Sequence, residues 1–136
     1  MTIADVEDHI IDTVEGLGLF RQVISAGRKT IPAVLSYPSA LVCFVSDANA
    51  GIGSRLVMIE RYQVVVVHKN LASEKDVARS VYDLIVSVRD GLHGKDWGHD
   101  ELDQMNFEKT ELISYEAGEI AYAMTFSVVH KYGVVT

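Results

Sequence analysis

The sequence predicts one α+β domain, in which a mostly antiparallel sheet carries two helices on one face. Two stretches, 2–17 and 73–92, place apolar residues at helical spacing, whereas the other apolar stretches are continuous or alternate as in strands. Their order along the chain is helix, weak strand, two strands, helix and two strands. The chain has 136 residues, which suits a single domain, 1–136, with its own hydrophobic core.

The first helix is predicted from a cap and an apolar stripe. Thr2 is a suitable N-cap residue, and Asp5 stands three positions later as an acidic partner in a capping box. Gly16 and Gly18 are expected to end the helix. The stripe that would face the core consists of Ile3, Val6, Ile10, Val14 and Leu17.

Residues 20–31 give a weak strand signal, with a turn expected around Gly27. Residues 40–45 are apolar on both faces, which is typical of a central strand, and residues 46–54 have the composition of a hairpin loop. Residues 55–69 then form a long predicted strand. Its middle, from Glu60 to Gln63, is more polar, so we expect the strand to project beyond the core or to carry a bulge there.

The segment 68–70, His-Lys-Asn, is interpreted as the junction between that strand and the second helix rather than as an active site. Ser73 is a good N-cap residue, and Asp76 follows at capping-box spacing. The helix is expected to stop at Gly91 or Gly94. Its apolar face consists of Val77, Ala78, Val81, Leu84, Ile85, Val88 and Leu92.

The C-terminal part predicts a polar loop over 93–104, a strand over 105–115, a turn over 116–119 and a strand over 120–132. The last strand alternates most clearly. We expect its first face to pack on a helix and its second, smaller face to lie close to another layer or subunit. The first face holds Ile120, Tyr122, Met124, Phe126 and Val128; the second holds Ala121, Ala123, Thr125, Ser127 and Val129.

Composition narrows the possible functions. The net charge is −7 and the basic residues are scattered, which argues against direct nucleic-acid readout. The single cysteine, Cys43, lies within an apolar strand and is interpreted as a packing residue. The N-terminal stretch lacks the pattern of a secretion signal, and no apolar run is long enough to span a bilayer, so a soluble cytosolic protein is expected.

The strongest catalytic candidate is the polar loop, because histidine and carboxylate side chains suit zinc binding or acid–base chemistry. Its residues are His93, Asp96, His99, Asp100, Glu101 and Asp103. Their spacing matches no established metal motif, so a solvated loop is the preferred interpretation. The segment 51–54, Gly-Ile-Gly-Ser, lacks the lysine and the following helix of a phosphate-binding loop. His68 and His130 are interpreted as sheet residues. We therefore predict no catalytic residue, metal or cofactor.

Three stretches carry a resemblance to a known family. They are Asn70-Leu71, Ala78-Arg79-Ser80-Val81-Tyr82-Asp83-Leu84, and Val88-Arg89-Asp90-Gly91-Leu92-His93-Gly94. In this order they resemble the Mu-like phage tail terminator family. The resemblance extends to the acidic helix 3–14, the proline-led strand 38–42 and the last strand 121–126, and so covers most of the chain. Residues 20–37 and the loop around Trp97 match poorly.

The resemblance implies a non-enzymatic virion protein of the tail neck region, assembled in the host cytoplasm. It implies a homo-oligomer, a hexameric ring, that caps the tube of a contractile tail, stops growth of tube and sheath, and offers a surface for joining the head. The implied partners are the tail tube protein, the sheath protein and a neck or connector protein. DNA would pass through without specific binding; six copies at −7 each carry −42.

We hypothesise that the hairpin loop, the polar middle of the long strand and the polar loop make the ring and tube contacts. The residues are Asn49, Gly51, Gly53, Arg55, Glu60, Arg61, Gln63, Lys95, Asp96, Trp97 and His99. Three alternatives stay open. They are another neck or head–tail connector protein, a small α+β enzyme that uses the loop 93–103, and a monomeric α+β binding module.

Overall fold

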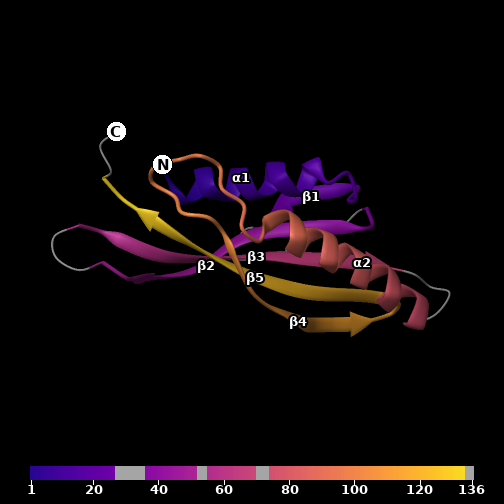
Figure 1. The fold of residues 1–136 in the computed structure, drawn as a ribbon. Coiled ribbons are helices and arrows are strands. Elements are labelled where there is room, and N and C mark those ends of the chain that lie inside the picture. The colour runs from indigo at the N-terminus through magenta and orange to yellow at the C-terminus, as the bar shows by residue number, and fades with distance from the viewer. Residues whose placement is uncertain (27–35, 52–54, 70–73, 134–136) are drawn as a thin grey trace.

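The structure is a computed structural model that describes residues 1–26, 36–51, 55–69 and 74–133, with side chains of the second helix described from residue 79 onward. Seven elements follow one another along the chain (Figure 1). They are α1 (Ile3–Gly16), β1 (Gln22–Ser25), β2 (Ser39–Asn49), β3 (Val57–Lys69), α2 (Glu74–Leu92), β4 (Asn106–Glu116) and β5 (Glu119–Lys131).

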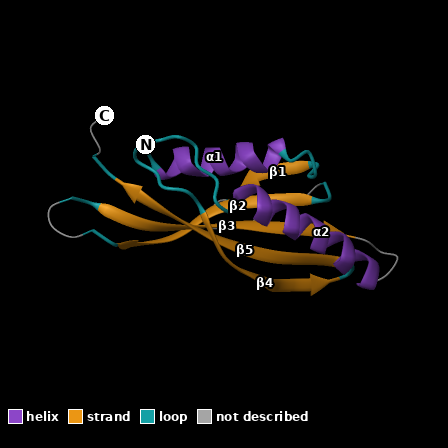
Figure 2. Cartoon of the chain, viewed as in Figure 1, coloured by secondary structure: helices purple, strands orange, loops and turns teal. Residues whose placement is uncertain are grey.

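The five strands form one sheet in the order β1-β2-β3-β5-β4. β1 runs parallel to β2, and the other neighbouring pairs are antiparallel. Figure 2 shows α1 and α2 on the same face of this sheet. The predicted α+β fold, with a mostly antiparallel sheet and two helices on one face, is confirmed.

The first helix begins as the sequence predicts. The Thr2 hydroxyl accepts the Asp5 backbone N–H at 3.1 Å, and the Asp5 carboxylate accepts the Thr2 backbone N–H at 2.8 Å. This reciprocal pair satisfies two N–H groups that the first turn leaves without helical partners. Val6, Ile10 and Val14 are buried against the sheet, so three positions of the predicted stripe face the core.

The core lies between the helices and the central strands β3 and β5. Tyr62, Val64 and Val66 of β3 alternate inward, opposite Phe126, Met124 and Tyr122 of β5. The predicted inward face of β5, Ile120 to Val128 at every second residue, belongs to this core cluster. On the other face of the sheet, Leu41, Val65, Val67, Ala121 and Ala123 form a second, smaller buried cluster.

The hairpin differs from the sequence prediction. Residues 46–49 are not loop, because β2 continues to Asn49 and pairs with Met58 of β3. β3 begins at Val57 rather than at residue 55. A bulge is present at the level of the polar middle of β3, but it lies in the partner strand, where the register shifts between Phe44 and Ser46. The predicted features at Gly27, Asn70 and Ser73 lie outside the described residues.

Cys43 of β2 is half-buried, with a pKa that burial and the nearby Glu7 raise above its ordinary value. A thiol whose pKa is raised carries less thiolate, which is the nucleophilic form. Cys43 is less buried than the predicted core residue, because it is half-buried and belongs to neither buried cluster.

Candidate functional site

Strands β2 and β3 continue as a hairpin past the part of the sheet that the helices cover (Figure 1). Two hydrogen bonds stabilise the end of the hairpin. The Ala50 N–H donates to the Val57 carbonyl oxygen at 2.8 Å, and the Asn49 side-chain oxygen accepts the Gly51 N–H at 2.9 Å. A side chain at Gly51 would lie 2.6 Å from the Arg55 carbonyl oxygen, so only glycine fits there. Arg55 is exposed, and the predicted contact residue Gly53 lies outside the described residues.

Glu60 lies at the base of this hairpin with a completely buried side chain. Its Oε1 accepts the Tyr62 hydroxyl at 3.0 Å and lies 2.8 Å from His130 Nδ1, and its Oε2 accepts the Tyr132 hydroxyl. We name Glu60, Tyr62, His130 and Tyr132 the buried polar cluster. The prediction of Glu60 as a surface contact is corrected: Glu60 points to the same face as Tyr62 and Val64, under the loop and the end of β5.

The two tyrosines of this cluster hold their protons strongly. Burial raises the pKa of the Tyr62 phenol well above its usual value, and the neighbouring Glu60 carboxylate raises it further. The pKa of Tyr132 is raised by burial and by its hydrogen bond to Glu60. Both phenols therefore act as donors to the Glu60 side chain, so its buried oxygens have hydrogen-bond partners.

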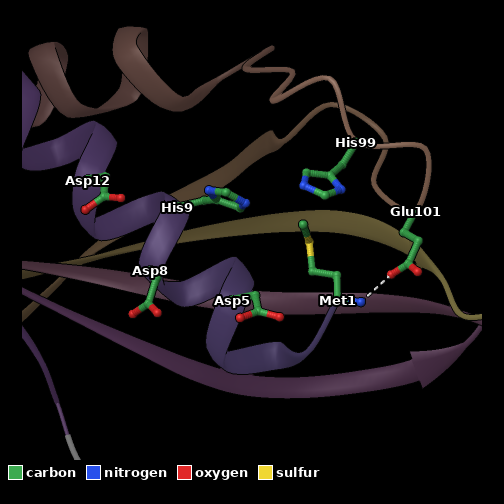
Figure 3. A pocket seen from close by; sticks show the side chains of 7 residues that line it. All are labelled: Met1, Asp5, Asp8, His9, Asp12, His99 and Glu101. Carbon is green, nitrogen blue, oxygen red and sulfur yellow. Dashed lines mark hydrogen bonds and ion pairs between the residues drawn. The ribbon is translucent and has the colours of Figure 1, made fainter.

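The polar loop closes over the cluster from the other side. Glu101 Oε2 accepts the Met1 amine at 2.8 Å and lies 3.5 Å from His130 Nε2. The hydrogen bond from the amine lowers the pKa of the Glu101 carboxyl. An open hollow of about 520 Å³ lies between this loop and α1. Figure 3 shows Glu101 and His99 on the side of the loop, across from acidic residues of α1. The hollow is lined by Met1, Asp5, Asp8, His9, Asp12, His99 and Glu101.

Trp97 attaches the same loop to α1. Its indole stacks on the His9 ring at 5.6 Å between centroids and donates to the Thr13 hydroxyl at 3.2 Å. The ring centroids of His99 and His9 are 5.7 Å apart. Lys95 and Asp96 are exposed. The Trp97 side chain thus makes contacts within the monomer, whereas the side chains of Lys95 and Asp96 are accessible to solvent.

The remaining two predicted contact residues lie on the sheet face opposite the helices. Arg61 Nε pairs with Glu108 at 2.9 Å, and Gln63 Nε2 donates to Thr125 at 3.4 Å. The predicted contact set therefore occupies three separate places: the hairpin, the open sheet face and the loop over α1. It does not form one continuous surface.

The acid–base residues of the loop are dispersed. His93 Nδ1 accepts the Phe107 N–H at 3.0 Å, Glu101 binds the Met1 amine, and Asp103 pairs with Lys131 at 2.7 Å. Within the described residues, no three His, Cys, Asp or Glu side chains converge as a metal ion requires. In the same part of the chain, no helix has the length and apolar character needed to cross a bilayer.

Sequence reasoning missed the buried polar cluster, although strand parity contained the signal. Glu60 stands two residues before the inward Tyr62, and His130 stands two residues after the inward Val128. An acid and a histidine at inward positions of paired strands predict a buried pair.

Comparison with known proteins shows similarity at the level of the fold. No family model matches the chain, and no curated protein matches it. Among solved structures, 33 chains match. One belongs to the "Virion of native gene transfer agent (GTA) particle", with a TM-score of 0.59 and 13% sequence identity, and the match covers 87% of this chain and 84% of that chain. The two chains share a fold over most of their lengths.

Proposed function

We propose that this chain is a structural protein of a phage-like virion and acts there as the tail terminator. The observation that carries the proposal is the fold that this chain shares, over 87% of its own length, with a chain of the gene transfer agent virion. The ordered resemblance to the Mu-like tail terminators supports the finer role.

In this role, copies form a closed ring, proposed to be a hexamer, on the last ring of the tail tube. The ring stops growth of tube and sheath and receives the neck or connector protein. A net charge of −7 per copy suits a channel for DNA, because an acidic wall repels phosphate and lets the duplex pass without adhering.

The hairpin is the best-placed contact element of the predicted set. It projects from the body, and Arg55 at its end is exposed and makes no ion pair within the described residues. Arg61 is a weaker candidate, because its guanidinium already pairs with Glu108 of the same molecule.

The alternative of a small enzyme loses its main support, because the loop's histidines and carboxylates bind separate partners. Metal analysis of the purified protein still tests it: stoichiometric zinc or manganese would favour the enzyme over the ring. A connector between portal and tail has the same structural class, and binding to isolated tail tubes distinguishes the two.

The experiment mixes the purified protein with isolated tail tubes and images the tube ends by electron microscopy. We expect a ring at the end of each tube and no further tube growth. Arg55→Glu should reduce the occupied ends, whereas Arg21→Glu is the matched control, because Arg21 is also exposed but lies between α1 and β1. Bare tube ends with the unaltered protein would contradict the terminator role.

A further inference from the structure

An exposed apolar surface lies where α2 faces the edge strand β4. Tyr82 and Val86 of α2 and Leu112 and Ile113 of β4 are each between 42% and 56% exposed. We name these four residues the apolar strip. Large apolar side chains exposed together, rather than singly, are typical of an interaction site.

The strip is continuous through one β5 residue. Leu112 stands directly opposite Tyr122 in the β4–β5 ladder, and the Tyr82 and Tyr122 rings meet edge to face with 6.4 Å between centroids. Val86 follows Tyr82 by one helical turn. Ile113 is the residue that a register shift between Leu112 and Ser114 leaves without a direct partner, and its side chain is exposed.

The projecting hairpin carries a second exposed apolar surface. Val45 is the extra residue of the bulge in β2, and Leu56 stands at the start of β3; they are 46% and 49% exposed. We name Val45 and Leu56 the hairpin patch. A hairpin that leaves the body of the sheet and exposes apolar side chains at its base and end is suited to contact another molecule.

Leu56 and the apolar strip lie far apart along the sheet and cannot meet within one molecule, whereas Val45 lies nearer the strip, beside Tyr62 and Arg61. Leu112 is level with Val66 of β3 through Tyr122, and Leu56 directly precedes Val57. Nine residues of strand separate those levels, which corresponds to about 30 Å. Figure 1 shows the hairpin and the N-terminal end of α2 at opposite ends of the molecule.

We propose that the hairpin patch of one copy docks on the apolar strip of the next copy, and so forms the head-to-tail contact of the ring. This inference rests on the proposed tail-terminator function. A closed ring needs a heterologous interface made from two different surfaces of the same chain. The described residues supply one such pair, the hairpin patch and the apolar strip.

Charge supports a second copy as the occupant. Arg55 precedes Leu56 on the hairpin, whereas Asp83 follows Tyr82 of the strip; Glu111 is adjacent to Leu112 but pairs opposite Ala123, on the other face of the sheet. Arg55 and Asp83 are exposed and make no ion pair within the described residues, although Glu111 pairs with Lys109 at 3.2 Å. Docking brings the Arg55 guanidinium beside the Asp83 carboxylate, and such complementarity sets the orientation of the contact.

The test uses cysteine cross-linking in a Cys43→Ser background, which removes the chain's one thiol. L56C and L112C are introduced singly and together, and a short thiol-to-thiol cross-linker is added to concentrated protein with and without isolated tail tubes. The matched control combines L56C with L19C, because Leu19 is a comparably exposed apolar residue outside both surfaces.

We expect the L56C/L112C protein to give a ladder of covalent oligomers, and a mixture of the single variants to give covalent dimers. The control pair should give neither. Leu112→Asp should lower the association constant by about tenfold or more, as truncation of central apolar contacts usually does, while Leu19→Asp leaves it unchanged.

Four results would overturn the inference. Rings on tube ends without the L56C–L112C link would overturn this contact and leave the terminator role intact. Covalent products that stop at the dimer with the double variant would indicate a two-fold contact instead of a ring. A link from the L112C thiol to a protein of different mass would make that protein the occupant. Neither rings nor links would contradict both proposals.

Discussion

The buried polar cluster makes Glu60 the most informative position for mutation. Glu60→Ala removes a carboxylate that accepts the Tyr62 and Tyr132 hydroxyls and contacts His130 Nδ1 at 2.8 Å. The substitution leaves these three groups without their partner under the loop. Tyr62 and His130 are fully buried, so water does not replace the lost acceptor without structural change.

The expected cost follows from these contacts. A buried hydrogen-bonding group left without its partner costs about 1–3 kcal/mol, and losses within one cluster are not additive. Glu60 contacts three such groups, so we expect Glu60→Ala to cost at least about 3 kcal/mol, which is a large share of the roughly 5–15 kcal/mol that stabilises a typical domain.

Urea unfolding measures this change as a shift of the midpoint at an unchanged slope. The matched control is Glu111→Ala, because Glu111 pairs with Lys109 on the exposed strand β4 and should contribute about 1 kcal/mol or less. If Glu60→Ala costs no more than Glu111→Ala, then Glu60 is not the centre of a buried network, and its interpretation as an exposed contact residue would return.

Two further predictions concern the same core. Phe126→Ala should cost about 3–5 kcal/mol in urea unfolding, because the ring is fully buried and meets Phe107 edge to face; a loss well under about 1 kcal/mol would contradict that placement. The pKa of Tyr62 is raised in the folded state, so the folded protein keeps a proton that the unfolded chain releases above a pH of about 10. Stability should therefore fall as pH rises past that value, and Tyr62→Phe should make the fall shallower, as urea midpoints at several alkaline pH values will show.

The sequence predicts the elements whose side chains repeat with a clear period. The first helix has both a capping pair and a stripe, and the last strand alternates without interruption from Ile120 to Val128. Each pattern is local, and the tertiary contacts agree with it. The fold class follows, because helices and strands with one apolar face have few ways to cover each other.

The polar middle of β3 could not be placed from local pattern alone. In the sequence, Glu60 and Arg61 are two adjacent charged residues of one predicted strand. In the structure, their side chains point to opposite faces of the sheet. Arg61 reaches Glu108 at the surface, whereas Glu60 is buried because β5 supplies His130 and the following Tyr132 from 70 or more residues away. Such a partner is visible only when the strand pairing is known.

The loop 93–104 is mostly exposed, as the sequence predicts, but its attachment to α1 could not be predicted for a related reason. Trp97 and the histidines form a polar sequence without period, which is typical of a solvated loop. Their contacts with His9 and Thr13 of α1 depend on the end of the helix lying beside the loop. Hydrogen-bonding side chains on a loop therefore indicate polarity, but not whether the partner is water, another part of the chain or another protein.

The structure separates the residues that stabilise the monomer from those available for assembly. Glu60, Phe126 and their neighbours are buried in the sheet, whereas the side chains of the hairpin patch and the apolar strip are exposed. Val45 and Ile113 lie at register shifts, and the ladders keep their pairing on either side of each residue. Charged substitutions at the exposed positions should then leave urea unfolding nearly unchanged. A change that weakens self-association at constant stability would locate the interface directly, since a general loss of folding would lower both.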